Sequence, residues 1–111
     1  MFNTSSPPPP CFFSGHTPLS FAARIGHLEL VRLFLLDYGA KIHKGESLLY
    51  FESAHLPDRL EICRLLLERG ADVNLKAPLT PPLNFSAEVG DLEVCRLLLQ
   101  NDADVNAKSS E

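Results

Sequence analysis

Apolar positions recur along the chain in a pattern that appears three times. Leu28 begins the stretch LELVRL, and nearly the same letters return from Leu60 (LEICRL) and from Leu92 (LEVCRL). These three leucines follow one another at intervals of 32 residues. A period of this length is typical of stacked helical repeats and not of a single closed globule. The pattern therefore predicts a short solenoid.

The first copy predicts two helices joined by a tight turn. Thr17 and Pro18 have the character of an N-cap and a first helical residue, because the threonine side chain can accept a bond from a free amide and proline needs no partner there. Gly26 supplies the left-handed residue that ends this helix. A second helix, from Leu28 to about Leu36, is apolar over more than one face and must be enclosed. Helices of at most roughly 12 residues depend on their neighbours for stability.

These residues carry a resemblance to a known family. The segment GHTPLSFAARIGH from Gly15 to His27, followed by the leucine-rich helix and Gly39-Ala40, resembles the ankyrin repeat. The resemblance extends over residues 13–108 and implies an all-α fold. It further implies a short solenoid of stacked helix-turn-helix pairs with projecting hairpin-like loops.

The resemblance divides the chain into segments. Repeat one is 13–44, repeat two 45–76 and repeat three 77–108, with a Pro/Ser-rich disordered arm at 1–12 and a tail at 109–111. Repeat two is irregular: Ser47 can cap its first helix, but a loop at 54–59 replaces the tight glycine turn. Repeat one has one extra residue, which predicts a bulge at Asp37 or Tyr38. Asp102 stands where a left-handed glycine is expected.

No catalytic or metal-binding motif is found in the sequence. The four histidines are His16, His27, His43 and His55, and the pattern of repeats spreads them over different turns and loops. His27 and the matching Asp91 follow a turn glycine, which favours a turn role for both. We therefore expect that the chain is no enzyme and that it holds no cofactor.

The three cysteines do not form a disulfide framework. Cys63 and Cys95 occupy the position of Val31 in successive repeats, which predicts small buried apolar groups rather than reactive thiols. Acidic and basic residues three apart on the second helices predict exposed ion pairs within each helix. The pairs are Glu29 with Arg32, Glu61 with Arg64, and Glu93 with Arg96.

Composition excludes several classes of partner. The formal net charge is −4 and the pI is near 5.5, so we expect no nucleic acid ligand. Apolar runs are only a few residues long, whereas a membrane span needs about 20, so we expect no membrane insertion. The N-terminal residues lack the basic start and apolar core of a secretion signal. These observations predict a cytoplasmic or nuclear location.

The resemblance implies a non-catalytic protein–protein interaction module or scaffold, which binds a partner protein on a concave surface of fingers and first helices. The alternative is a regulatory or targeting fragment of a larger ankyrin-containing enzyme, channel or adaptor. Carried over residue by residue, the family's variable surface positions are Phe13, His16, Arg24, Ile25, His43, Lys44, Glu46, His55, Thr80, Glu88 and Val89.

Two further expectations follow from the resemblance. Asn74 and Asn106 follow Asp-Val in the fingers and match a motif that an oxygen-dependent dioxygenase can hydroxylate in this family. The last second helix ends in Leu97, Leu98 and Leu99 without the polar cap that terminal repeats normally carry. This apolar end predicts marginal stability or self-association through the uncapped C-terminal repeat.

Overall fold

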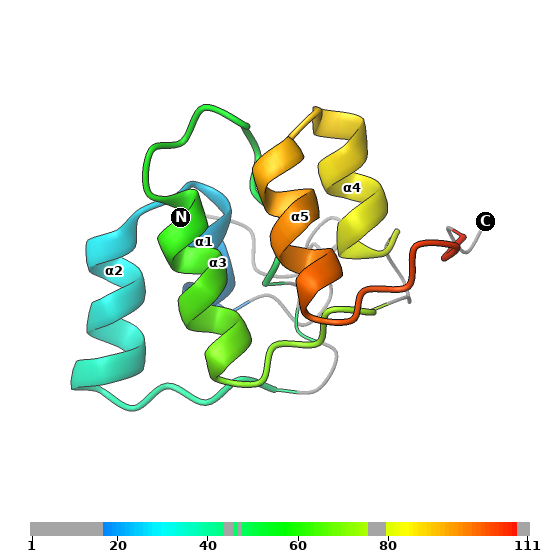
Figure 1. Cartoon of the computed structure of the whole chain (residues 1–111). Helices are drawn as coiled ribbons and strands as arrows, with labels where there is room; N and C mark the ends of the chain where they lie inside the picture. Colours follow the sequence, from blue (N-terminus) through cyan, green and yellow to red (C-terminus); the bar gives the residue numbers. More distant parts are fainter. Residues whose placement is uncertain (1–16, 44–45, 47, 76–79, 109–111) are drawn as a thin grey trace, which may run out of the picture.

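The computed structural model describes residues 17–43, 46, 48–75 and 80–108. Within these ranges the chain has five α-helices, one π-helical turn and no strand. They are α1 (Pro18–Arg24), α2 (Leu28–Arg32), the π-helical η1 (Leu33–Asp37), α3 (Arg59–Glu68), α4 (Pro82–Val89) and α5 (Leu92–Gln100). The helices α2, α3 and α5 stand side by side, while α1 packs against α2 and α4 against α5 (Figure 1). The predicted all-α repeat fold is confirmed.

Repeat one forms the predicted helix-turn-helix pair. Thr17 caps α1: its Oγ1 accepts from the Ser20 amide at 3.2 Å, while Ser20 Oγ accepts from the Thr17 amide at 2.8 Å. Pro18 is the first helical residue. Gly26 follows with φ of 78°, the left-handed conformation expected there. His27 then caps α2, since its Nδ1 accepts from the Leu30 amide at 3.2 Å.

The extra residue of repeat one is absorbed by η1. The Tyr38 amide donates to the Leu33 carbonyl at 3.1 Å, a bond that spans five residues instead of four. Such a π-turn accommodates one additional residue without breaking the helix. Leu35 remains in the core at 3% exposure, whereas Leu36 and Tyr38 are 50% and 80% exposed. The predicted bulge therefore takes the form of a π-helical turn just ahead of Tyr38.

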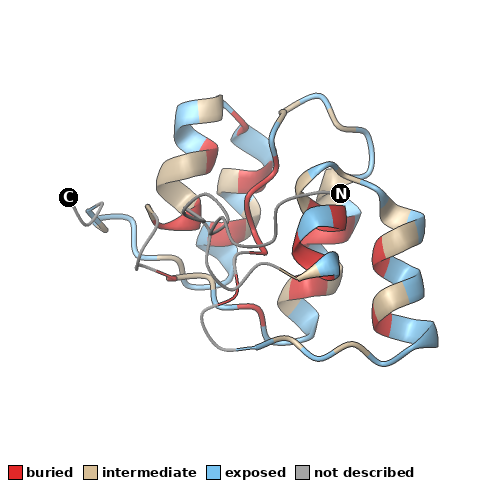
Figure 2. Ribbon diagram, turned by 180° about the vertical axis from the view of Figure 1, so that it is seen from behind, coloured by how far each residue is buried: buried red, intermediate tan, exposed pale blue. Residues whose placement is uncertain are grey.

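Repeat two lacks the first helix that its sequence position predicts. Leu48 to Ser53 form an irregular segment, and Leu48, Leu49, Tyr50 and Phe51 are buried in it (Figure 2). The Tyr50 ring meets the Phe85 ring edge to face with centroids 5.4 Å apart, and its hydroxyl donates to the Thr80 carbonyl at 2.6 Å. Tyr50 and the charged Glu52 stand where repeat one has the small buried residues Ser20 and Ala22, which let α1 lie close to its partner. The expected helix capped by Ser47 is thus wrong, and Ser47 itself lies outside the described residues.

The core runs through the stack along the second helices. Val31 and Cys63, at equivalent positions in α2 and α3, are both 0% exposed, which confirms the structural role predicted for Cys63. Cys95 is only partly buried, and its Sγ lies 3.2 Å from Ser86 Oγ. Burial raises the pKa of the Cys63 thiol to about 12, so this thiol stays protonated at neutral pH.

One ion pair of the second helices forms between repeats. Arg32 Nη2 lies 2.8 Å from Glu61 Oε2 on the next helix, with the two side chains 47% and 56% exposed. The sequence predicts Arg64 of the same helix as the partner of Glu61, and this prediction is wrong, because side chains on adjacent helices of the stack approach as closely as those one turn apart.

Among the described helices, none is long and apolar enough to cross a bilayer.

Candidate interaction surface

The inserted loop of repeat two lies between the turns of repeats one and three. We call this side of the molecule the turn edge, made of residues 25–27, 53–58 and 89–91. Leu56 packs one end of the loop closely against the first turn. A Cβ added to Gly26 would come within 3.0 Å of the Leu56 Cβ. A shallow hollow of about 290 Å³ separates the loop from the first turn and is lined by Ile25, Gly26, His27, Leu28, Glu29 and Asp58.

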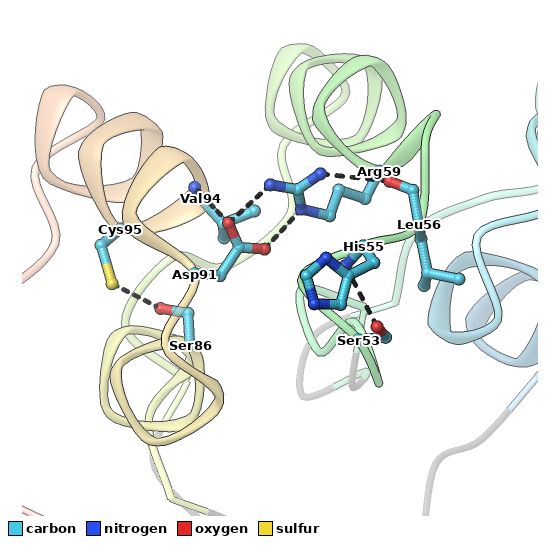
Figure 3. Close-up of polar contacts among 8 residues, drawn as sticks. All are labelled: Ser53, His55, Leu56, Arg59, Ser86, Asp91, Val94 and Cys95. Carbon is cyan, nitrogen blue, oxygen red and sulfur yellow. Dashed lines mark hydrogen bonds and ion pairs between the residues drawn. The ribbon is translucent and has the colours of Figure 1, made fainter.

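The other end of the loop is held by an ion pair between Arg59 and Asp91, here called the clamp. Arg59 Nε lies 2.6 Å from Asp91 Oδ2, and Nη2 lies 2.9 Å from Oδ1, so the pair is bidentate (Figure 3). The Arg59 and Asp91 side chains are only 13% and 3% exposed. Arg59 Nη1 also donates to the Leu56 carbonyl at 3.2 Å. One guanidinium therefore ties the loop to repeat three.

Asp91 has a second role in the same place. Its Oδ1 accepts from the Val94 amide at 3.3 Å, which caps α5 in the way that His27 caps α2. The turn role predicted for Asp91 is confirmed. The hydrogen bond from Arg59 to Asp91 raises the pKa of the guanidinium further above its already high value. The carboxylate thus stabilises a helix start and the neighbouring repeat at once.

Sequence reasoning did not predict the clamp, although a signal was present. His27, Arg59 and Asp91 each precede the first leucine of the repeated helix motif, at equivalent positions 32 residues apart. In a stack, equivalent positions of adjacent repeats lie side by side. Opposite charges at two such positions in succession therefore predict an ion pair between repeats.

The structure divides the predicted partner-binding residues into two groups. One group lies on or next to the turn edge: Arg24, Ile25, His55, Glu88 and Val89. Ile25 is 50% exposed, His55 and Glu88 are exposed, and Val89 is half-buried. The His55 amide donates to Ser53 Oγ at 3.1 Å, a local bond that shapes the loop (Figure 3).

The second group lies at the opposite ends of the first helices, near the fingers. His43 is exposed there and, with Thr17 and Tyr38, lines an apolar hollow of about 320 Å³. Thr80 precedes α4 and is half-buried, with its carbonyl bound by Tyr50. Phe13, His16 and Lys44 lie outside the described residues. The predicted strip is therefore not one continuous row in the described part of the chain.

Glu46 corrects one of these predictions. It is 4% exposed, so it does not belong to the surface on which it was placed. Its Oε1 accepts from the His43 amide at 2.9 Å, and its Oε2 accepts from the Thr17 hydroxyl. A buried carboxylate needs such donors, because burial without them is costly. Glu46 instead links the cap of α1 to the segment that follows repeat one.

The fingers of repeats two and three are joined by Asn74. Its Nδ2 donates to the Asp102 carbonyl at 3.1 Å, and its Oδ1 accepts from the Asp104 amide at 2.8 Å. Asp102 has φ of 73°, which confirms the left-handed position predicted for it. Asn106 is exposed, with its amide bound to Asp104 Oδ1 at 3.0 Å. Hydroxylation of Asn74 and Asn106 stays a prediction.

The described residues include no group of three or more His, Cys, Asp and Glu side chains that could hold a metal ion. The candidate interaction surfaces described above are therefore the turn edge and the finger side, where exposed side chains lie beside contacts between repeats.

Comparison with known families agrees with this architecture. A family model described as ankyrin repeats (3 copies) matches residues 3–77, and a single ankyrin repeat model matches residues 81–110. A search of curated proteins found no match. Ankyrin repeats generally mediate protein–protein interaction. From the repeat period, the stacked helices and these matches, we conclude that the chain belongs to the ankyrin repeat family.

Proposed function

We propose that the chain is a non-catalytic protein-binding module whose partner docks on the turn edge. The observation that carries this proposal is the way the inserted loop is held. Leu56 packs on Gly26 at one end and Arg59 binds Asp91 at the other, while His55, Pro57 and Asp58 between and beside them are exposed. A surface loop fixed in this way loses little conformational freedom on binding.

The chemistry of the turn edge supports a protein partner with an apolar anchor and basic surroundings. Ile25 is half exposed on one side of the loop and Val89 half-buried on the other. Exposed carboxylates accompany them at Glu52, Asp58 and Glu88. Aliphatic groups ringed by charge are common at transient interfaces, where the apolar centre supplies affinity and the charged rim steers the encounter.

The proposal is tested by comparing glutamate substitutions on the turn edge with one on the finger side. The full chain, immobilised, is used to capture partners from native extract, with proteins identified by mass spectrometry. Ile25→Glu combined with His55→Glu should abolish capture of the specific partner, whereas His43→Glu, also at an exposed histidine but on the finger side, should leave it intact. Circular dichroism must show that all variants keep the wild-type helix content. Loss with His43→Glu alone would move the site to the fingers and refute the proposed edge.

The end of the stack supports a further part of this proposal, namely that the chain self-associates through its uncapped C-terminal repeat. Leu92 and Leu99 on α5 are 63% and 43% exposed, and Val105 in the last finger is 69% exposed. Large apolar side chains gathered at one end of a repeat stack are poorly solvated and favour burial against another surface.

A further inference from the structure

The second helices carry the same apolar stripe on the side that faces the following repeat. We call this the trailing stripe: Leu28, Val31 and Leu35 in repeat one; Leu60, Cys63 and Leu67 in repeat two; Leu92, Cys95 and Leu99 in repeat three. In repeat one Val31 and Leu35 are 0% and 3% exposed, because α3 follows. In repeat two Cys63 is 0% exposed and Leu60 and Leu67 are partly buried, because α5 follows.

In repeat three the two leucines of the same stripe are open. Leu92 and Leu99 are 63% and 43% exposed, whereas Cys95 between them is partly buried, with its Sγ 3.2 Å from Ser86 Oγ on α4. The residue types have not changed to polar ones at this end. The stripe on α5 therefore has the same residue types as the stripes on α2 and α3, which the second helix of the next repeat covers.

The opposite side of each second helix carries the complement, the leading stripe. It comprises Glu61 and Leu65 on α3, Glu93 and Leu97 on α5, and Glu29, Leu33 and Leu36 on α2 and η1. Leu65 and Leu97 are partly buried against the core, and Leu97 lines a hollow with Leu67 and Glu68 of the preceding α3. Leu33 and Leu36 are 38% and 50% exposed. The two ends of the described stack thus display the two halves of the interface that joins its repeats.

Charge follows the same arrangement. At the junction of α2 and α3, Arg32 of one helix binds Glu61 of the next at 2.8 Å. The corresponding residues are Arg96 on α5 and Glu29 on α2, both exposed, and Glu29 also lines the hollow beside the first turn. An approach of the α5 end to the α2 end of another molecule would bring an arginine and a glutamate into the same relation.

We propose that two copies of this chain stack head to tail, with the trailing stripe of α5 in one copy packed on the leading stripe of α2 and η1 in the other. This inference rests on the proposed self-association and names its surfaces. The contact is heterologous, since two different faces meet, so each pair leaves one free α5 end and one free α2 end. Association of this kind extends with concentration instead of closing at a dimer.

The test blocks each end separately. Leu99→Glu places a charge in the trailing stripe and leaves the leading stripe intact, while Leu36→Glu does the reverse. Both sites are about half exposed, so both variants should fold, which circular dichroism checks. Gln100→Glu adds the same charge to an exposed neighbouring position and is the matched control. Sedimentation velocity and light scattering of the full chain then report the mass as concentration rises.

The expected result is specific to the head-to-tail arrangement. Wild type and Gln100→Glu increase in mass with concentration, and each blocked variant alone stays at the monomer mass. An equal mixture of Leu99→Glu and Leu36→Glu reaches twice the monomer mass and stops, because one competent interface remains. Restoring the charge relation through Arg96→Glu with Glu29→Arg should retain more association than Arg96→Glu alone.

Other results would overturn the inference. A Leu36→Glu variant that still dimerises would show a two-fold contact between α5 ends. A wild type that remains monomeric throughout would mean that no second copy covers the stripe. A mixture that stays monomeric would exclude head-to-tail pairing. None of these outcomes changes partner capture by the turn edge, so failure here is distinguishable from failure of the proposed binding function.

Discussion

Loss of the clamp should destabilise the fold far more than loss of the exposed ion pair between Arg32 and Glu61. Both are arginine–carboxylate pairs between adjacent repeats, but their exposure differs: 13% and 3% for Arg59 and Asp91, against 47% and 56% for Arg32 and Glu61. Water screens the exposed pair and reaches the buried one poorly. The chain therefore contains its own control for the effect of burial.

The magnitude follows from the bonds that Asp91 makes. Removing one partner of a buried ion pair costs about 3–5 kcal/mol, because the other charge stays desolvated. At 13% exposure Arg59 can partly turn toward water, which favours the lower end of that range. Asp91→Ala also removes the cap of α5, worth about 1 kcal/mol, whereas Asp91→Asn retains an oxygen for the Val94 amide. Each variant would remove a large share of the roughly 5–15 kcal/mol that holds a small domain folded.

Urea unfolding followed by circular dichroism measures these differences, given that the chain unfolds in one transition. A double-mutant cycle with Arg59→Met and Asp91→Asn should give a coupling of about 2 kcal/mol or more, and Arg32→Met with Glu61→Gln less than about 1 kcal/mol. Added salt should reduce only the second coupling. Equal costs for Arg59→Met and Arg32→Met would refute the assignment of the clamp as the main tie between the inserted loop and repeat three.

Two further changes test the described packing. Burial raises the pKa of the Cys63 thiol from 9.0 to about 12, so the unfolded chain loses this proton first and stability should fall as the pH rises above about 9, by up to about 1 kcal/mol per pH unit. Cys63→Val introduces the residue type found at Val31 and removes the thiol. In urea titrations repeated across this pH range, the free energy of unfolding of this variant should begin to fall less steeply than that of wild type. An unchanged pH profile would show that Cys63 does not cause the decline. Gly26→Ala and Gly90→Ala both place a Cβ on a left-handed residue, but only the first meets Leu56 at 3.0 Å. Gly26→Ala should therefore lower the free energy of unfolding by about 1 kcal/mol more than Gly90→Ala, and equal losses would show that the Leu56 contact is loose.

The features that sequence reasoning predicted are those that depend on a few consecutive residues. The cap at Thr17, the turn at Gly26 and the left-handed Asp102 each follow from local stereochemistry. Cys63 was placed in the core by equivalence with Val31, since a repeat supplies an internal comparison where a single sequence offers none.

What could not be predicted depends on residues that meet only in the folded stack. The irregular segment around Tyr50 forms against Phe85 and Thr80, which lie some thirty residues further along the chain. The family resemblance predicts Glu46 as a variable surface position, yet the Thr17 hydroxyl and the His43 amide hold it inside. In these places the contacts between repeats decide the structure, and local preference does not.

The irregular repeat two has a consequence for how far this chain can be treated as a set of exchangeable units. In a regular array any unit can be deleted or duplicated, because every junction is alike. Here the junctions differ: repeat one meets repeat two through Gly26 and Leu56, and repeat two meets repeat three through Arg59 and Asp91. Deleting the middle unit would join two outer units that do not fit each other. Replacing it with a standard repeat would remove Leu56 and Arg59, and with them the contacts to Gly26 and Asp91. The chain is built from repeats, but its middle repeat cannot be exchanged for another, because each of its two junctions needs its own contacts.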